Sequence, residues 1–435
     1  MTILPQNDTG CGWLNLLKKR DVSPSLKQNI NAKWVVIGAG YTGLCAALSL
    51  AEMLPNDEII LLDAEHAGEG ASARNSGYLV DSTLNDGHLS DTGLSQYKQK
   101  YELNLVAVNF VKSLIKKHNI ECDWNECGKY YASSTSDNKA KLDNFMKLLD
   151  ELGLQNEFFD PKNLAHQLGT DFYKMAVKVF GGAMLQPAAL ARGLINALPA
   201  NVSLYENTPV LNISHDKKHH ISCQNAQINT ENLIIAVNGF MPNIGVKADR
   251  AFPLLLTASL TRRLSDAEQK SINNVGEWGV LSANPMGATL RYTADNRLMI
   301  RNTVEVSKSL VLSEADLLNR KSQHLKGLKI RFPFLSDDVI DHTWSGITCI
   351  SANNANIFEQ IKPKCWVVGC YNGGGIGLAA LFGHQVALAA NDKTSDIQRL
   401  IAARPQPKWL PPQPFLRWGV GAKLAIDRRK ATQEV

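Results

Sequence analysis

The fold is decided by the stretch Trp34-Val35-Val36-Ile37-Gly38-Ala39-Gly40-Tyr41-Thr42-Gly43, followed by Ile59-Ile60-Leu61-Leu62-Asp63. Four apolar residues before the first glycine predict a buried parallel strand, and a second apolar run before Asp63 predicts its neighbour. Between them, Leu44 to Met53 has the spacing of a helix that Pro55-Asn56-Asp57 ends. Together these segments predict the βαβ unit that binds a dinucleotide.

Each glycine of this unit has a physical task. Gly38 permits the sharp turn, Gly40 lets the backbone approach a pyrophosphate, and Gly43 lets the helix pack close to the strand. The pyrophosphate then lies at the helix N-terminus, where free N–H groups and the helix dipole stabilise its charge. Asp63 ends the second strand, where its carboxylate can accept both ribose hydroxyls. The pattern predicts an ADP-containing cofactor.

The next segment distinguishes one dinucleotide from another. The run Gly68-Glu69-Gly70-Ala71-Ser72-Ala73-Arg74-Asn75-Ser76-Gly77 is a small-residue loop with one cation, suited to wrapping a flavin's diphosphate and ring edge. Here the chain resembles the FAD-dependent amine and amino-acid oxidoreductases of the D-amino-acid oxidase superfamily, whose second fingerprint is similar to GASxRNxG. Within that group it is most similar to the γ-glutamylputrescine oxidoreductase branch.

The resemblance continues in order over about residues 34 to 390. Its further blocks are Ile120 to Trp124, Phe180 to Pro187, Leu204 to Val210, Leu233 to Gly239, Leu290 to Arg297, Trp344-Ser345-Gly346 and Gly369 to Gly377. It implies an α/β fold in which a Rossmann-type FAD-binding domain is interleaved with an antiparallel-sheet substrate domain.

The domains are therefore expected to be discontinuous. We expect an N-terminal extension at 1–30, an FAD-binding domain at 31–85, 155–240 and 335–395, a substrate domain at 86–154 and 241–334, and a basic tail at 396–435. Helical spacing predicts a long helix over Ser95 to His118 and a short one over Ala188 to Leu198. Apolar runs predict strands at Val202–Tyr205, Leu233–Val237 and Cys365–Gly369, the last leading into a helix through Ala390.

The second glycine cluster, Gly373-Gly374-Gly375-Ile376-Gly377, opens that last helix. A helix N-terminus there would face an anion, which the resemblance identifies as the N1–C2 carbonyl region of reduced flavin. The resemblance implies noncovalent FAD held by Gly38, Gly40, Tyr41, Thr42, Gly43, Asp63, Ala64, Gly70, Ala71, Ser72, Arg74, Asn75, Ser76, Gly77, Pro209, Val210, Asn238, Gly239, Gly346, Gly373, Gly374, Gly375, Ile376 and Gly377.

The expected reaction needs little from side chains. In such enzymes a hydride leaves the C–H bond next to an amine for flavin N5, the imine is hydrolysed, and oxygen or another acceptor reoxidises the flavin. The candidates for substrate contacts are Arg291, Tyr292, Arg301 and Trp344. Either arginine could hold a carboxylate in a bidentate way, or could be solvated or ion-paired on the outer face of the sheet.

Two positions depart from the family pattern. Asn353 stands where relatives carry an acid, and Gly374 stands where the branch carries a histidine. These changes leave open a flavoprotein that acts on a peptide or partner protein, and a non-catalytic FAD-binding protein. Cys349 lies near this segment, but its offset does not match a site of covalent flavin attachment.

Composition limits the remaining possibilities. A net charge of +5 spread over 435 residues does not indicate nucleic-acid binding. The sequence contains no secretory signal pattern, no spanning apolar run and no metal-binding cysteine cluster, so we expect a cytoplasmic enzyme without a metal. The tail combines Trp409 and Trp418 with Arg428-Arg429-Lys430. It could touch an anionic membrane or a protein partner, or pack over the nucleotide-binding domain.

Overall fold

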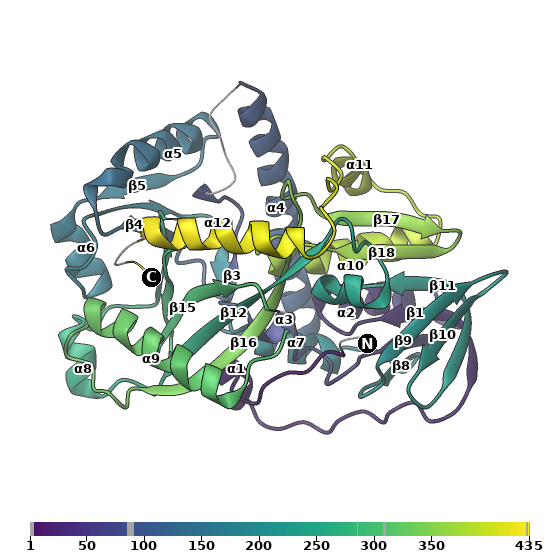
Figure 1. Cartoon of the computed structure of the whole chain (residues 1–435). Helices are drawn as coiled ribbons and strands as arrows, with labels where there is room; N and C mark the ends of the chain where they lie inside the picture. The colour runs from purple at the N-terminus through teal and green to yellow at the C-terminus, as the bar shows by residue number, and fades with distance from the viewer. Residues whose placement is uncertain (1–3, 85–90, 285, 308–309, 432–433, 435) are drawn as a thin grey trace.

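The computed structural model describes residues 4–84, 91–284, 286–307, 310–431 and 434. Figure 1 shows two sheets beside each other, with long helices stacked between and around them. The first sheet occupies the right of the view and the second sheet the left and centre. This arrangement agrees with the expected combination of a Rossmann-type sheet and a second, mainly antiparallel sheet.

The first sheet is built on the glycine-turn unit. Its strands run in the order β17-β18-β11-β1-β2-β8, and the hairpin β9-β10 is attached to β11. Their bounds are β1 Ile30–Ile37, β2 Ile59–Leu62, β8 Val202–Tyr205, β9 Val210–His215, β10 His219–Cys223, β11 Gln227–Ile235, β17 Ile357–Lys362 and β18 Cys365–Gly369. The contacts β11-β1, β1-β2, β2-β8 and β11-β18 are all parallel. The predicted strands at 202–205 and 365–369 are confirmed.

Close helix packing covers this sheet. The helices α2 (Tyr41–Met53), α10 (Gly375–Ala390) and α4 (Asp91–His118) share one apolar cluster with its strands. A Cβ at Gly43 would lie 1.7 Å from the carbonyl oxygen of Gly38, and one at Gly383 would lie 2.2 Å from that of Thr42. Glycine is therefore what allows α2 to touch both its own turn and α10.

The second sheet is formed mostly by the middle of the chain. Its strands run in the order β16-β12-β15-β14-β13-β4-β6-β5. Their bounds are β4 Lys129–Ser133, β5 Asn156–Phe159, β6 Met175–Val179, β12 Phe252–Thr261, β13 Trp278–Ser282, β14 Thr289–Tyr292, β15 Leu298–Glu305 and β16 Ile340–Ile350. Most neighbours are antiparallel, whereas β13 and β4 pair in parallel.

Sheet membership differs from the segment boundaries expected from the sequence. The segments 155–240 and 335–395 were expected in the nucleotide-binding domain, yet β5, β6 and β16 belong to the second sheet. The long β16 pairs with β12 from Phe252↔Ile350 to Thr261↔Ile340. A strand's apolar pattern shows that it is buried, but not which distant strand it joins.

The remaining elements connect and cover the sheets. They are α1 Gly12–Asn15, α3 Ala71–Arg74, β3 Tyr78–Leu79, η2 Ser136–Asn138, α5 Lys139–Glu151, α6 Pro161–Leu168, β7 Ala183–Met184, α7 Pro187–Asn196, η3 Asn238–Ile244, α8 Asp266–Ser271 and α9 Glu314–Arg331. The predicted helices at 95–118 and 188–198 correspond to α4 and α7, with shifted ends.

The part of the tail that the structure describes lies along both sheets (Figure 1). Helix α11 (Asp396–Ala402) packs through Ile401 on the helices of the first sheet, as expected for a tail over the nucleotide-binding region. Helix α12 (Phe415–Ala431) instead crosses the second sheet (Figure 1), where Leu416 packs with Phe252 and Leu254. Among the described helices, none has the length and apolar character needed to cross a bilayer.

Candidate active site

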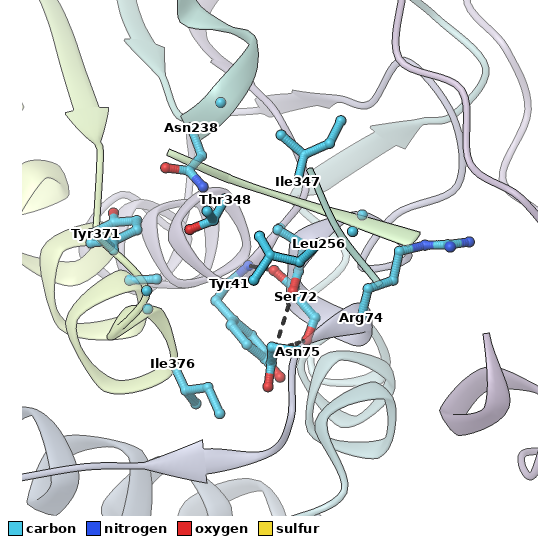
Figure 2. Close-up of a pocket in the computed structure, with 18 of the residues that line it drawn as sticks. Tyr41, Ser72, Arg74, Asn75, Asn238, Leu256, Ile347, Thr348, Tyr371 and Ile376 are labelled. Carbon is cyan, nitrogen blue, oxygen red and sulfur yellow. Dashed lines mark hydrogen bonds between the residues drawn. The ribbon is translucent and has the colours of Figure 1, made fainter. Parts of the chain in front are cut away.

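One continuous cavity of about 560 Å³ runs from the glycine turn after β1 to the face of the second sheet. The turn, the loop around Ser72, the β16 segment Gly346–Thr348 and the N-terminus of α10 all contribute to its wall. Figure 2 shows this convergence: Tyr41 and Ser72 lie opposite Tyr371 and Ile376, with Leu256 and Ile347 above them. The cavity therefore joins the glycine turn of the first sheet to the second sheet.

The glycine turn forms a tight cradle. Gly38 has φ +97°, and a Cβ there would lie 2.7 Å from the carbonyl oxygen of Ala236. The backbone N–H of Tyr41, at the start of α2, donates to Ser72 Oγ (2.9 Å). A glycine-rich turn at the beginning of a 13-residue helix is the arrangement that binds a pyrophosphate. The residues present therefore fit the diphosphate of an ADP-containing cofactor.

Asp63 lies at the end of β2, where it lines the cavity. Its Oδ2 accepts a hydrogen bond from the N–H of Ala39 (2.8 Å), and its Oδ1 accepts one from the N–H of Glu65 (2.9 Å). Burial raises the pKa of the Asp63 carboxyl to about 6, although these two N–H groups oppose the shift. Each oxygen has a second lone pair, so the carboxylate is oriented and still able to accept ribose hydroxyls.

The loop between β2 and β3 is held by its own polar side chains. Asn75 Nδ2 donates to the carbonyl of Ser72 (2.7 Å), and the N–H of Gly77 donates to Asn75 Oδ1 (2.8 Å). These bonds keep the backbone of Ala71 to Ser76 against the cavity.

The sequence suggested that Arg74 holds the cofactor, but in the structure its guanidinium binds other parts of the protein. Its guanidinium extends away from Tyr41 and Tyr371 (Figure 2) and forms an ion pair with Asp8 (Nη1–Oδ1, 3.1 Å). It also donates to the carbonyls of Glu69 (2.9 Å) and Ser345 (3.0 Å). The cation thus ties together the N-terminal extension, the loop and β16, and Arg74 is also one of the residues that line the cavity.

The glycine cluster before α10 leaves open space. Gly373 has φ +87° and Gly374 caps the helix, and a Cβ at Gly374 would come no closer than 3.8 Å to the carbonyl oxygen of Tyr371. The Tyr371 hydroxyl is hydrogen-bonded to Thr42 Oγ1 (2.7 Å), which joins this turn to α2. The cavity is therefore wider here than it would be with a histidine at position 374.

The four candidate substrate residues fall into two pairs. Arg301 and Trp344 line the cavity, whereas Arg291 and Tyr292 do not. The guanidinium of Arg291 is buried and binds Glu277 (Nη2–Oε1, 2.7 Å) and the carbonyl of Leu185 (2.5 Å). Tyr292 is buried in the core of the second sheet, where its hydroxyl donates to Asn296 (2.8 Å). The indole N–H of Trp344 donates to the carbonyl of Arg74 (3.1 Å).

Arg301 projects from β15 into the cavity and donates to Thr289 Oγ1 (2.6 Å). Among the described residues, its guanidinium forms no ion pair with a carboxylate. Burial lowers the pKa of Arg301, which reflects the cost of holding a charge away from water. An anionic ligand would offset this cost.

Most of the residues expected to hold the cofactor line the cavity. They come from segments that lie between positions 38 and 376 of the sequence. Those in its wall are Gly38, Gly40, Tyr41, Thr42, Asp63, Ala64, Gly70, Ala71, Ser72, Arg74, Asn75, Ser76, Val210, Asn238, Gly239, Gly346, Gly373, Gly374, Gly375 and Ile376. Gly43, Gly77, Pro209 and Gly377 lie behind it. Gly77 gives room to Arg291, because a Cβ there would be 2.2 Å from Nη1.

Sequence reasoning missed several wall residues. Tyr78, Tyr131 and Asn104 line the cavity from β3, β4 and α4. The Tyr131 hydroxyl donates to the carbonyl of Ser82 (3.0 Å), and Asn104 Nδ2 donates to that of Asp81 (2.9 Å). Their positions depend on the pairing of distant elements, so no local motif indicates them.

The departure at Asn353 lies outside this wall. Asn353 Nδ2 donates to the carbonyl of Gln406 (3.0 Å), and its Oδ1 accepts from the N–H of Lys408 (3.0 Å). The amide therefore fastens the tail to the body instead of facing the cavity. Cys349 is also directed away, into an apolar cluster that contains Cys370. No cysteine is found in the described wall of the cavity, which fits a noncovalently held cofactor.

The comparisons with known proteins agree with this geometry. The family described as FAD dependent oxidoreductase (DAO) matches residues 33–389. Probable oxidoreductase OrdL of Haemophilus influenzae is 27% identical over 382 residues, which cover 84% of each protein. Gamma-glutamylputrescine oxidoreductase of Escherichia coli is 26% identical over 372 residues, covering 83% of this chain and 84% of that protein.

Solved structures show the same fold. Glycine oxidase from Geobacillus kaustophilus superposes with a TM-score of 0.70 at 17% identity, covering 84% of this chain and 96% of that one. L-proline dehydrogenase from P. horikoshii gives a TM-score of 0.68 at 15% identity, covering 85% and 96%. The expected D-amino-acid oxidase-like fold is confirmed. The chain therefore belongs to the DAO family of FAD-dependent oxidoreductases, and it is an enzyme whose cofactor is FAD.

Proposed function

We propose that this enzyme oxidises a C–N bond of a small amine or amino acid that carries a carboxylate. The observation that carries the proposal is Arg301, a half-buried cation that lines the cavity and is hydrogen-bonded only to a hydroxyl among the described residues. Gamma-glutamylputrescine oxidoreductase, glycine oxidase and L-proline dehydrogenase are named for substrates of this kind.

FAD is held by the turn at Gly38–Gly40, by Asp63, by the loop from Gly70 to Ser76 and by the N-terminus of α10. When bound, FAD supplies the hydride acceptor at flavin N5, and oxygen or another acceptor restores its oxidised form. The protein contributes position and environment.

The charges of the cavity favour the reactive form of the substrate. In the described wall, the carboxylates are Asp63 and Glu65 at the nucleotide end, whereas the end toward the second sheet carries Arg301. Because no carboxylate of the described wall lies at that end to pair with an ammonium, the neutral amine is favoured, and it carries the lone pair that hydride loss from the adjacent carbon requires.

Apolar residues complete the reaction site. Leu256 and Ile347 face Ile376 across the cavity (Figure 2). They fix the orientation of the substrate and exclude water during hydride transfer. The imine product is hydrolysed after the transfer.

Anaerobic reduction of the bound flavin tests this function. Purified holoenzyme is mixed with polyamines, N-methyl amines and amino acids, and the loss of flavin absorbance is followed until air is admitted. We expect bleaching by amines that bear a carboxylate, and slow or no bleaching by diamines of similar length without one. Equal rates for both classes would contradict the carboxylate requirement, and no bleaching by any amine would contradict amine oxidation itself.

A further inference from the structure

Helix α12 is apolar on two opposite sides. On its inner side, Leu416, Val420 and Leu424 pack on the second sheet. On its outer side, Phe415, Trp418 and Ile426 are 63%, 65% and 53% exposed. A surface helix that needs only to cover a sheet is apolar on one side, so the outer residues require another explanation.

The outer residues follow helical spacing. Phe415, Trp418, Ala422 and Ile426 lie at intervals of three and four residues, which places them in one outer stripe along α12. The rings of Phe415 and Trp418 are in edge-to-face contact, with centroids 5.9 Å apart. Trp409, just before the helix, is 58% exposed. The stripe is therefore a contiguous apolar surface that begins with aromatic side chains.

Basic residues border the outer stripe. Lys423, Arg428, Arg429 and Lys430 are all exposed, and the one acid of the helix, Asp427, pairs with Lys423 (2.9 Å). Aromatic side chains prefer the boundary between water and hydrocarbon, and neighbouring cations bind anionic headgroups.

We propose that α12 docks this enzyme on the surface of an anionic lipid bilayer. The outer stripe enters the interface, and Arg429 and Lys430 contact the headgroups. The helix lies flat because its inner side stays on the second sheet. A second copy of the chain is a poorer occupant, since it would bring the same basic residues together on a protein whose net charge is already +5.

Vesicle sedimentation of the FAD-loaded protein tests the proposal. We expect binding to vesicles of phosphatidylcholine mixed with phosphatidylglycerol, weak binding to phosphatidylcholine alone, and loss of binding at high salt. The variant F415S/W418S should abolish binding. The variant R429Q/K430Q should weaken it by roughly tenfold or more, because each cation near an anionic surface contributes about 1 kcal/mol.

Matched controls separate docking from general surface changes. L318S alters a side chain that is 67% exposed on α9, and K116Q/K326Q removes two exposed cations elsewhere. Both should bind vesicles as the wild type does, and all variants should retain flavin and the wild-type melting temperature. The proposal is overturned by failure to bind anionic vesicles, by equal binding of F415S/W418S, or by self-association or an acidic protein partner that depends on the stripe without lipid binding.

Discussion

Asp8 and Arg74 form an ion pair that joins the N-terminal extension to the glycine-rich loop of the cofactor site. Their side chains are 11% and 3% exposed, and Asp8 also accepts from the N–H (2.9 Å) and hydroxyl (2.6 Å) of Ser345 on β16. The extension is thus part of the frame that positions the loop against the cavity.

The variant D8A should therefore weaken FAD binding. Removing one partner of a buried ion pair costs a few kcal/mol, so we expect the dissociation constant of FAD to rise roughly tenfold to hundredfold. Flavin content and titration of the apoprotein with FAD measure the effect. The control variant is D143A, which breaks an ion pair on the surface: the side chain of Asp143 is 38% exposed and that of its partner Lys139 is 59% exposed. It should leave FAD binding unchanged. Equal flavin retention in D8A would show that the pair does not hold the loop.

Arg301 and Arg291 should respond differently to the same substitution. R301M should raise KM for carboxylate-bearing amines roughly tenfold to hundredfold, since hydrogen bonds to charged groups contribute about 1.5–3 kcal/mol. The rate with amines that lack a carboxylate should not fall. Steady-state kinetics with both substrate classes measure this selectivity.

R291M provides the comparison, because it leaves the buried carboxylate of Glu277 without its partner. We expect lower stability, by about 3–5 kcal/mol, and poor yield of folded protein, without selectivity between substrates. If R301M slowed both substrate classes alike, Arg301 would have a structural role instead.

Two glycine-to-alanine changes should have opposite outcomes, because Gly43 is tightly packed whereas Gly374 borders the open cavity. In G43A, the new Cβ would lie 1.7 Å from the backbone oxygen of Gly38, so α2 must move away from its turn. We expect a loss of about 1–3 kcal/mol or more and little bound FAD. In G374A the nearest atom would be 3.8 Å away, and we expect a folded, flavin-loaded enzyme. Thermal unfolding and flavin content check both outcomes, and normal FAD binding by G43A would refute the packing argument.

His324 should make stability depend on pH. Its ring is fully buried on α9 beside Ser259 (Nδ1–Oγ, 2.7 Å), and burial lowers its pKa from 6.5 to about 3. Between these values the unfolded chain binds a proton that the folded chain does not, so stability falls as pH falls from about 6.5 toward 3. The variant H324Q removes this contribution.

Urea unfolding at a series of pH values, followed by tryptophan fluorescence, measures the difference between H324Q and the wild type. We expect the midpoint of H324Q to decline less steeply below pH 6.5. Parallel pH profiles for the two proteins would show that His324 is not the group responsible.

The sequence predicted those parts of the fold and the site that are specified by a few consecutive residues. The strand at 202–205, the strand at 365–369 and the glycine turn after β1 are each encoded by a run of neighbouring residues. Those runs also carry the family resemblance, because the chemistry of a dinucleotide requires glycine at fixed spacing.

Arg291 and Arg301 show why the local sequence is not enough to predict which side chain faces the cavity. Thr289 pairs with Arg301 across β14 and β15, and Arg291 lies two residues from Thr289, so both arginines are on the same face of the sheet. What separates them is Glu277, which binds Arg291. Such partners come from tertiary contacts, as does Asp8 for Arg74, and no periodicity in the sequence reports them.

The order of strands in the first sheet has a consequence for how the enzyme is made. The central strands β1 and β11 emerge from the ribosome long before β18, which pairs with β11 and leads into the helix that closes the cofactor site. Strand β10 covers only residues 227–230 of that edge of β11, so residues 233–235 stay unpaired until β18 arrives, and unpaired edges invite aggregation. FAD can be seated only after most of the chain has been synthesised, and a ligand that binds only the native state shifts the equilibrium toward folding. A shortage of riboflavin is therefore expected to lower the folded fraction of this protein, because less FAD is present to stabilise the native state.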